Sequence, residues 1–423
     1  MLDLKFIRDN FQQVEEGIRR KNAKISMDEL RLLDSRRRQI ITASEEKKAE
    51  LNKLSKEIGI MMKEKKSVED IKARAKDLSS EITRLDEDLK NAESQLREVL
   101  LRIPNLPHRD IPTGDASHNT VVKEWGTVRQ FSFKPKDHIS LAETLHLIDF
   151  ERGAKIGGSG FMLFTDRGAS LVRALMNFMI DLHTQKHGYR EVFPPFLVRR
   201  ECMIGTGQLP NLEEDMYKAT ADDLFLIPTA EVPVTNMYRE EVLKEDDLPI
   251  YHTAYSACFR REAGSYGKDT KGLVRVHQFD KIELVKLVKP EGSYEELERL
   301  RADAEEVLQI LGLPYRTVML ASGDLSFAAA KCYDLELFAP GVNRWLEVSS
   351  CSNFEDFQAR RANIRFKRRD GKMEFVHTLN GSGVAFPRLI VALLEHYQQE
   401  DGSVIVPDAL QKYWRGYERI ERQ

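Results

Sequence analysis

Residues 256–283 read Ser256-Ala-Cys-Phe-Arg-Arg-Glu-Ala-Gly-Ser-Tyr-Gly267, then a linker, then Arg275-Val-His-Gln-Phe-Asp-Lys-Ile-Glu283. This pattern predicts a strand, a loop that contains glycines, and a second strand. Charged residues occupy strand positions that ordinarily point into a sheet, namely Arg260, Glu262, Arg275, Lys281 and Glu283. Because successive strand side chains alternate between two faces, Phe279, Lys281 and Glu283 share one face. A ring, a cation and an anion on one face suit the floor of a ligand site; the alternative is a surface hairpin with charged pairs across it.

The bulk properties describe a globular protein of about two or three domains. The 423 residues carry a formal net charge of −3, so a polyanionic partner would have to be bound by local basic patches. No apolar run approaches the ~20 residues that a membrane span needs, and the N-terminus lacks an apolar signal core. We therefore expect no membrane association and a cytoplasmic location. The four cysteines, Cys202, Cys258, Cys332 and Cys351, have no zinc-ligand spacing, so no zinc is predicted.

Residues 27–101 differ in composition from the rest of the chain, with one glycine, no proline and many charges. The second half carries an apolar heptad seam: Val68, Ile71, Ala75, Leu78, Ile82, Leu85, Leu89, Ala92, Leu96 and Val99. A weaker seam in the first half is interrupted by Arg37, Ser44 and Lys47. Two seams separated by residues 62–67 predict an antiparallel coiled-coil hairpin, an arm of roughly 50 Å. Dimerisation or spacing is the ordinary use of such an arm, and its basic clusters, Arg36–Arg38 and Lys63, Lys65 and Lys66, support phosphate contact only weakly.

Three prolines and a glycine in residues 102–114 mark a domain boundary. We expect an N-terminal domain over 1–104 and a second domain over 105–423. In the second domain, strands separated by hairpins and loops, with helices between groups, predict an α+β fold with an antiparallel sheet flanked by helices. The expected helices are 3–22, 141–150, 169–186, 294–311 and 386–398. The expected strands are 161–164, 189–197, 224–227, 250–259, 274–287 and 315–320.

Three further polar stretches interrupt apolar surroundings. They are Pro228-Thr-Ala-Glu231, Arg344-Trp-Leu-Glu-Val-Ser-Ser-Cys-Ser-Asn353, and Leu379-Asn-Gly-Ser-Gly-Val-Ala-Phe-Pro-Arg388. In the last, glycines would let a ligand approach the backbone closely, and Arg388 lies near a helix start, where anions bind well. Each stretch alone is a weak signal, because a lone Thr-Ala-Glu is commonly a helix cap and a lone Asn-Gly a turn. Their joint order is far more specific.

With the arm ahead of them, these stretches resemble a bacterial-type seryl-tRNA synthetase, a class II aminoacyl-tRNA synthetase, over nearly the full chain. The strand that ends at Pro194-Pro195 resembles the first class motif, which builds a homodimer interface. Residues 259–283 resemble the second motif, and Asn380 to Arg388 the third. Thr229-Ala-Glu231 resembles the serine-specific segment.

The resemblance implies a role for each matching residue. The catalytic residues would be Arg260, at the α-phosphate of ATP, and Arg388, which packs over the adenine. The serine-binding residues would be Thr229, Ala230, Glu231, Glu283, Asn380 and Ser382. The ATP-binding residues would be Arg260, Arg261, Glu262, Arg275, Val276, Phe279, Glu347, Val348, Ser349, Ser350 and Arg388. Within these sets, Glu262 would read the adenine amino group, Phe279 would stack on the base, and Glu347 and Ser350 would hold Mg²⁺. Arg261 departs from the small polar residue of many relatives.

The reaction implied is ATP-dependent activation of L-serine to seryl-adenylate, then transfer of serine to the 3′ end of tRNA(Ser), which the arm would grip. Whether tRNA(Sec) is also charged stays open, and no general base for the transfer is evident. One alternative is a related ligase that loads a carrier protein, but such relatives lack the long arm. Another is a silent paralogue that acts as a scaffold, against which the intact charges of the buried floor argue.

Overall fold

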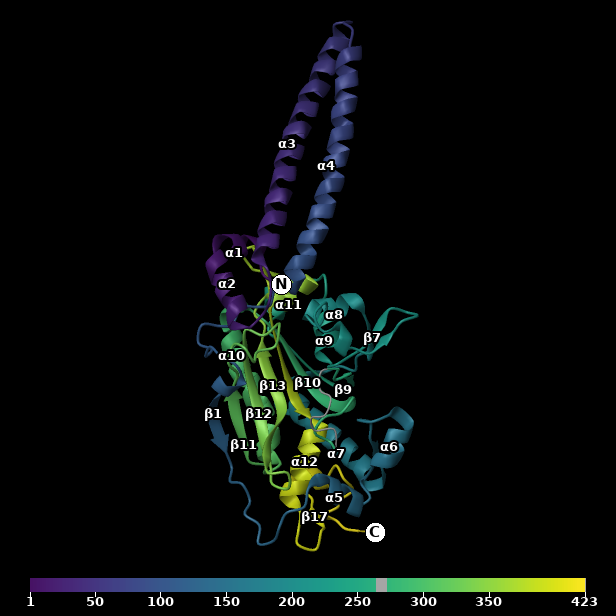
Figure 1. Ribbon diagram of the computed structural model, residues 1–423, viewed down its shortest axis with the longest axis vertical. Helices are drawn as coiled ribbons and strands as arrows, with labels where there is room; N and C mark the ends of the chain where they lie inside the picture. Colours follow the sequence, from purple (N-terminus) through teal and green to yellow (C-terminus); the bar gives the residue numbers. More distant parts are fainter. Residues whose placement is uncertain (264–271, 423) are drawn as a thin grey trace. The chain divides into compact units, whose positions relative to one another are not determined.

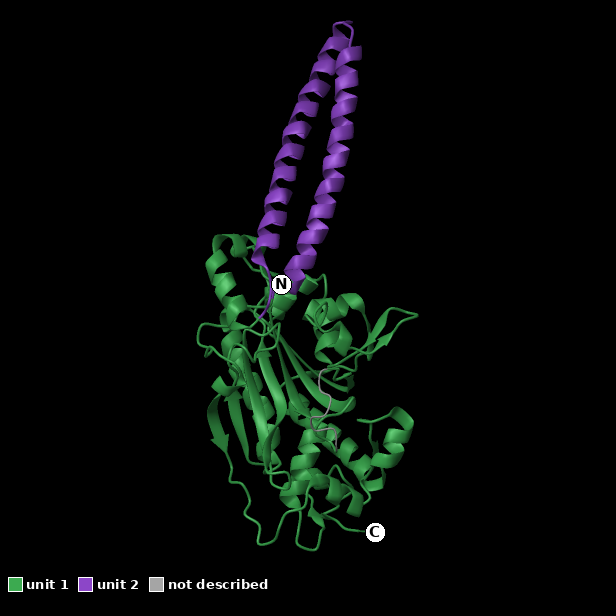
Figure 2. Cartoon of the chain, in the orientation of Figure 1, with its two compact units in different colours: residues 1–22, 104–423 green, residues 23–103 purple. Residues whose placement is uncertain are grey.

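The computed structural model describes residues 1–263 and 272–422 (Figure 1). Its contacts divide the chain into two compact units (Figure 2). One consists of Met1–Asn22 and Pro104–Gln423, and the other of Ala23–Ile103. The first 22 residues therefore group with the larger unit, whereas the predicted division placed them with the arm. Residues 264–271 of the second-motif resemblance lie outside the described residues.

The smaller unit is the predicted helical hairpin, which is confirmed. Helix α3 (Met27–Lys63) and helix α4 (Glu69–Arg102) run antiparallel. The buried side chains of α4 include Leu78, Ile82, Leu96 and Val99, which belong to the heptad seam.

Polar residues that interrupt the seam of α3 contact the facing helix instead of leaving gaps. Arg37 Nε lies 3.0 Å from Glu93 Oε1, Ser44 Oγ lies 3.3 Å from Asp86 Oδ1, and Lys47 pairs with Glu81. The two ion pairs are exposed to solvent, which screens them, so each adds little to stability. Their main effect is to fix the register of the two helices. Arg37 is thereby engaged within the arm, while Arg36 and Arg38 remain exposed.

An eight-stranded sheet forms the centre of the larger unit, and the predicted α+β class is confirmed. Its strand order is β1-β11-β12-β13-β16-β10-β9-β4, antiparallel except for the β4–β9 pair. The strands are β1 (Thr120–Trp125), β4 (Arg190–Glu191), β9 (Ile250–Phe259), β10 (Gln278–Val288), β11 (Tyr315–Met319), β12 (Lys331–Ala339), β13 (Arg344–Asn353) and β16 (His377–Ala385).

Smaller sheets and helices surround the large sheet. The small sheets pair β2 (Ile148–Asp149) with β3 (Leu163–Phe164), β5 (Leu197–Arg199) and β6 (Lys218–Ala219) with β7 (Leu224–Leu226), β8 (Val242–Lys244) and β15 (Met373–Phe375) with β14 (Arg365–Lys367), and β17 (Val404–Ile405) with β18 (Arg419–Ile420). The α-helices are α1 (Leu4–Asp9), α2 (Phe11–Arg20), α5 (His138–Thr144), α6 (Phe150–Gly157), α7 (Asp166–Gln185), α8 (Arg200–Thr206), α9 (Glu231–Asn236), α10 (Ser293–Ile310), α11 (Phe357–Ala362), α12 (Phe386–Tyr397) and α13 (Asp408–Gln411). None of the helices in the described part of the chain combines the length and the apolar character of a membrane span.

Three predicted elements differ from the structure. The helix expected over 3–22 is interrupted at Asn10, which is the C-cap of α1 and the N-cap of α2. The helix expected over 141–150 ends at Thr144, and His146 then takes a positive φ of 52° that no α-helix accommodates. The strand expected over 189–197 is two short strands in different sheets, β4 and β5. Pro194 and Pro195 lie between them and cannot donate to a ladder.

Two glycines of β16 make room for helices on one face of the large sheet. A Cβ atom on Gly381 would lie 2.4 Å from Leu300 Cδ2 of α10, and one on Gly383 would lie 2.7 Å from His183 Nε2 of α7. Since strand side chains alternate, Asn380 and Ser382 point to the opposite face. The expectation that these glycines serve close approach of a ligand is therefore wrong, because helix packing occupies that space.

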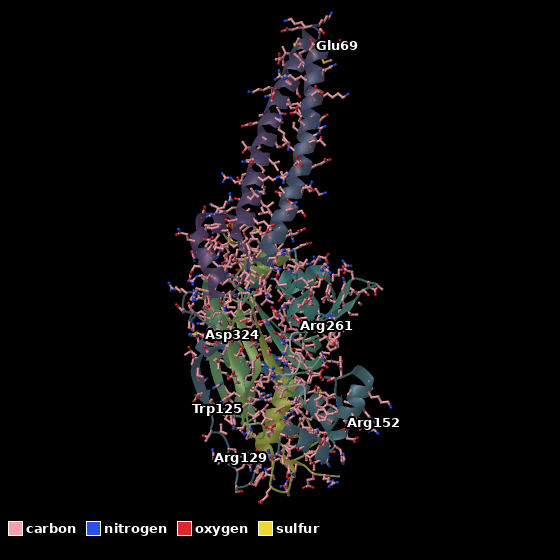
Figure 3. The ribbon with its side chains drawn as sticks, viewed as in Figure 1. Glu69, Trp125, Arg129, Arg152, Arg261 and Asp324 are labelled. Carbon is pink, nitrogen blue, oxygen red and sulfur yellow. The ribbon has the colours of Figure 1, made fainter. Side chains whose placement is uncertain are left out.

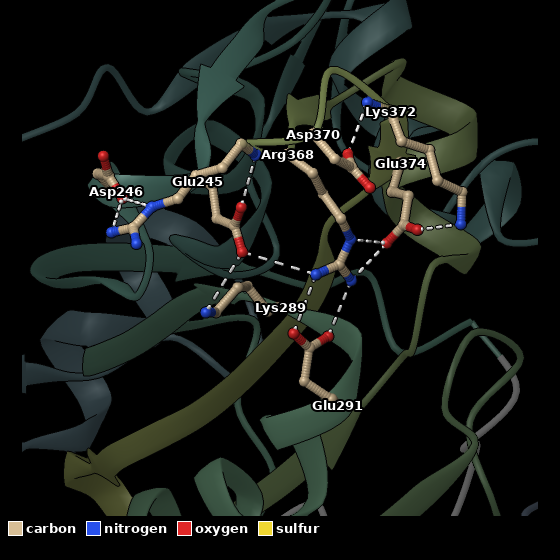
Figure 4. Close-up of polar contacts among 9 residues, drawn as sticks. Glu245, Asp246, Lys289, Glu291, Arg368, Asp370, Lys372 and Glu374 are labelled. Carbon is tan, nitrogen blue, oxygen red and sulfur yellow. Dashed lines mark hydrogen bonds and ion pairs between the residues drawn. The ribbon is translucent and has the colours of Figure 1, made fainter.

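An ion-pair network holds the sheet of β14, β15 and β8 to the rest of the unit (Figure 4). Arg368 donates to Glu374 Oε2 at 2.7 Å and to both Glu291 oxygens at 3.0 and 3.1 Å. Arg369 donates to Asp246 Oδ1 at 2.7 Å. The Arg368 guanidinium lowers the pKa of Glu291 to about 2, and these contacts join three segments that are far apart in sequence.

Candidate active site

A pocket of about 750 Å³ lies on the face of the large sheet to which Asn380 and Ser382 point. Most of the predicted site residues line it. They are Thr229, Glu231, Arg260, Glu262, Arg275, Val276, Phe279, Glu347, Val348, Ser350, Asn380, Ser382 and Arg388. The four polar stretches, which are up to about 160 residues apart in the sequence, thus come together at one place.

The two strands predicted within residues 256–283 are present as β9 and β10. β9 has the predicted bounds of 250–259, whereas β10 begins at Gln278 and not at 274. β9 ends at Phe259, which is opposite Gln278 at the start of β10. Arg260, Glu262 and Arg275 consequently lie beyond the strand ends, not within the sheet. The backbone bends there because Glu262 has a positive φ of 52°. These long side chains therefore line the rim of the pocket, which suits a flexible polyanion better than buried strand positions would.

The cations at the rim are held by neighbouring oxygens and rings. The Arg260 guanidinium lies 5.1 Å from the centre of the Phe279 ring, and Arg260 Nε donates to the Pro228 carbonyl at 3.4 Å. Arg275 Nη1 donates to Glu262 Oε2 at 2.7 Å. Within residues 1–263 and 272–422, these contacts use only part of the five donors of each arginine, which leaves donors for phosphate oxygens.

Arg388 is fixed at the start of α12 by two backbone carbonyls. Its Nε donates to Val274 O at 3.1 Å, and its Nη1 donates to Glu347 O at 2.8 Å. A planar cation held this way can cover one face of a flat ring, while Phe279 on β10 presents an aromatic face to the same pocket.

A buried hydrogen-bonded cluster forms the floor of the pocket. Thr229 Oγ1 donates to Glu283 Oε2 at 2.7 Å and accepts from Lys281 Nζ at 2.9 Å. Asn380 Nδ2 donates to Glu283 Oε1 at 2.9 Å, and Lys281 also forms an ion pair with Glu283. Glu283 is fully buried, so these partners must replace water in stabilising its negative charge. Its two oxygens lie beneath Thr229, Lys281 and Asn380, which themselves line the pocket.

Glu231, at the start of α9, is the second carboxyl group of the pocket floor. It is 6% exposed, and its Oε1 accepts from Gln358 Nε2 at 2.6 Å. Burial and the negative charge of Glu283 raise the pKa of Glu231 to about 7. A carboxyl group with that pKa gains its charge most readily when a cation is brought beside it.

Glu347 and Ser350 lie on β13 at the pocket, and β12 presents a third oxygen group to them. Ser350 is opposite Asp334 in the ladder. Burial and the charge of Glu347 raise the pKa of Asp334 well above its ordinary range. Two carboxyl groups and a hydroxyl that crowd in this way are the hard oxygen donors that Mg²⁺ prefers. In the described residues, three or more His, Cys, Asp or Glu side chains nowhere gather in a way that could hold a metal ion.

Four predicted residues do not line the pocket. Glu283 lies beneath it, and Ala230 is the buried N-cap residue of α9. Ser349 Oγ donates to the Ser382 carbonyl at 2.6 Å, which ties β13 to β16 beneath the site. Arg261 is exposed and donates to the Glu214 carbonyl at 2.9 Å (Figure 3). These contacts support the neighbours of each residue, and their predicted ligand contacts remain predictions.

Sequence reasoning assigned no role to two residues of this site. Lys281 lines the pocket, and its position on one face with Phe279 and Glu283 was the available signal. Gln358 lies on α11, outside every polar stretch, and nothing in its sequence surroundings indicated that it would contact Glu231.

Comparison with known proteins agrees with the fold. A family model described as Seryl-tRNA synthetase N-terminal domain matches residues 1–107, and one described as tRNA synthetase class II core domain (G, H, P, S and T) matches residues 215–397. A serine–tRNA ligase of Carboxydothermus hydrogenoformans is 53% identical over 425 residues and covers 100% of both chains. One of Caldicellulosiruptor saccharolyticus is 56% identical over 414 residues and covers 98% of both.

Solved structures give the same result. The seryl-tRNA synthetase of Pyrococcus horikoshii, determined in complex with ATP, superposes with a TM-score of 0.94 at 37% identity over 100% of both chains. The cytoplasmic serine–tRNA ligase of Naegleria fowleri, in complex with AMP, has a TM-score of 0.90 at 31% identity and covers 100% of this chain and 99% of that one. Identity of this extent over the whole chain, together with the pocket described above, shows that the chain belongs to the seryl-tRNA synthetase family.

Proposed function

We propose that this protein activates L-serine with ATP to form seryl-adenylate and diphosphate, and then transfers the seryl group to the 3′ end of tRNA(Ser). The observation that carries the proposal is one pocket in which arginines and an aromatic ring at the rim adjoin two carboxyl groups in the floor. The rim suits a nucleoside triphosphate, and the floor suits a small substrate that carries an ammonium group.

The nucleotide would lie across the rim. Phe279 stacks on the adenine, Arg388 covers its other face, and Glu262 accepts from the adenine amino group. Val276, Val348, Ser349 and Arg261 support or border the nucleotide. Adenine then enters a slot between a ring and a guanidinium, an arrangement that accepts any flat base, so Glu262 supplies the discrimination.

The first chemical step is attack of the serine carboxylate on the α-phosphate, with diphosphate as the leaving group. Negative charge develops on the phosphoryl oxygens, so a fixed cation at that point lowers the barrier. Arg260 has this role. Mg²⁺, held by Glu347 and Ser350, would neutralise phosphate charge when bound.

The amino acid would lie on the floor. Glu231 faces the serine ammonium group with Thr229 and the backbone of Ala230 beside it. Glu283, with Asn380 and Ser382, meets the hydroxyl group. Alanine leaves these buried polar groups unpaired and is rejected strongly, whereas threonine must be excluded by the shape of the pocket.

The remaining assignments concern partners. The α3–α4 arm recognises the shape and the sugar-phosphate backbone of tRNA(Ser), with Arg36 and Arg38 as exposed candidate contacts. The protein acts in the cytoplasm as a homodimer, with the segment around Pro194-Pro195 at its interface. No zinc takes part.

Amino-acid-dependent ATP–diphosphate exchange, measured with all twenty amino acids, tests this function directly. We expect exchange with serine and only background with alanine, glycine and threonine. A serine signal no higher than that of these three would refute the proposal. Charging assays with tRNA(Ser) and tRNA(Sec) transcripts then determine which RNA accepts the seryl group.

A further inference from the structure

Gln358 is a fully buried glutamine whose side chain touches the carboxyl group of Glu231. It lies on α11 and is 1% exposed. Its Nε2 donates to Glu231 Oε1 at 2.6 Å and to the Thr206 carbonyl at 3.1 Å. Its Oε1 accepts from Thr378 Oγ1 at 2.7 Å. Both amide hydrogens and the amide oxygen are therefore used.

These partners allow only one orientation of the amide. The Thr206 carbonyl can only accept, so the NH₂ group must face it. Thr378, on β16 two residues before Asn380, donates to the amide oxygen from the other side. A rotated amide would place its oxygen against the Thr206 carbonyl and leave buried groups unpaired. Gln358 thus presents its second N–H to Glu231 as a fixed donor.

The charged groups around Glu231 give this donor its importance. Glu283 of β10 repels the ionised form of Glu231, while Lys281 of β10 and Arg260 beyond β9 favour it. Burial also opposes ionisation, and the hydrogen bond from Gln358 favours it. The balance leaves the pKa of Glu231 near neutrality, so a change in one partner alters its charge at physiological pH.

We propose that Gln358, held by Thr378 and by the Thr206 carbonyl, is a positioning residue that orients Glu231 and keeps it ionised for the ammonium group of the amino-acid substrate. This role rests on the proposed activation of serine and extends it to a helix that none of the polar sequence stretches includes. Gln358 touches no substrate itself; it acts through Glu231.

The test is the pH dependence of the KM for serine in ATP–diphosphate exchange, for the parent protein and for Gln358→Met. Removal of the donor disfavours the ionised carboxylate, so we expect the KM at pH 7 to rise about tenfold. The KM of the parent should level off at about one pH unit above 7, whereas the KM of the variant should keep falling to about one unit higher. The kcat should change far less than the KM.

Two further variants separate positioning from a general loss of stability. Gln398→Met removes an equally buried glutamine whose Nε2 donates to the carbonyls of Lys136 and Glu395, neither of which lines the pocket, and it should leave the KM profile unchanged. Thr378→Val removes one hydroxyl group, should shift the profile in the same direction by less, and serves as the test if Gln358→Met does not fold. A KM profile of Gln358→Met or Thr378→Val that superposes on that of the parent, or an equal shift in Gln398→Met, would overturn the proposal. If the parent itself gives no serine-dependent exchange, the proposed function fails instead.

Discussion

Replacing Glu231 by glutamine should stabilise the ligand-free protein at neutral pH while it weakens serine binding. Burial and Glu283 raise the pKa of Glu231 from 4.5 to about 7. The folded state therefore binds a proton more tightly than the unfolded state does. Its contribution to stability is present below about pH 4.5 and is lost as the pH rises to about 7.

The size of this effect follows from the shift in pKa. A difference of about 2.5 units corresponds to roughly 3 kcal/mol of stability lost between pH 4.5 and pH 8. Glutamine is neutral throughout, and its amide oxygen can still accept from Gln358. The difference in unfolding free energy, variant minus parent, should accordingly be about 3 kcal/mol larger at pH 8 than at pH 4.5, which means that the variant is the more stable of the two at pH 8 by that additional amount.

Urea unfolding followed by tryptophan fluorescence measures this difference in the larger compact unit, which contains the pocket. The three tryptophans, Trp125, Trp345 and Trp414, all lie in the larger unit, so unfolding of the arm does not contribute to the signal. In exchange assays the KM of the variant for serine should be high and independent of pH, whereas that of the parent falls as Glu231 ionises. A difference in unfolding free energy between variant and parent that is the same at both pH values would refute the reasoning.

Three other changes test the rest of the site and the role of the arm. Lys281→Met should lower the unfolding free energy by about 3–5 kcal/mol because it leaves Glu283 buried without its cation. In a double-mutant cycle, adding Glu283→Gln should recover part of that loss. Additive losses would contradict the ion pair. Arg260→Ala should lower serine-dependent exchange roughly a hundred- to a thousandfold with little change in unfolding; a folded variant with normal exchange would remove Arg260 from the α-phosphate. Replacing residues 23–103 by a short glycine-serine linker should spare exchange and abolish tRNA charging, and equal loss of both would refute the separate role of the arm.

The design of that deletion uses a feature of the larger unit. Lys21, just before the arm, donates to Ala329 O at 2.6 Å, and Asn105, just after it, donates to Ala328 O at 2.9 Å. Both ends of the cut thus contact adjacent residues of one segment. We therefore expect a short linker to join them.

The sequence predicted what depends on pattern and local chemistry. Heptad spacing predicted the α3–α4 hairpin, and alternation predicted that Phe279 and Lys281 share a face, which the pocket confirms. The end of β9 at Phe259 was predicted. The sequence did not predict that β10 begins only at Gln278 or that β4 and β5 are separate strands, because both depend on tertiary packing. It assigned no role to Gln358, because a glutamine on a short helix carries no signal until the fold places it against Glu231.

The residues of β16 show why sequence motifs and site geometry are only partly related. Asn380 and Ser382 line the pocket, whereas the intervening Gly381 and the following Gly383 receive Leu300 and His183 from the helices behind the sheet. One short motif therefore meets two independent requirements, since alternation sends ligand-facing and helix-facing residues to opposite faces of a single strand. A side chain at Gly381 would clash with the Leu300 side chain of α10. The two glycines therefore serve the packing of α10 and α7 against the sheet, while Asn380 and Ser382 of the same strand face the pocket.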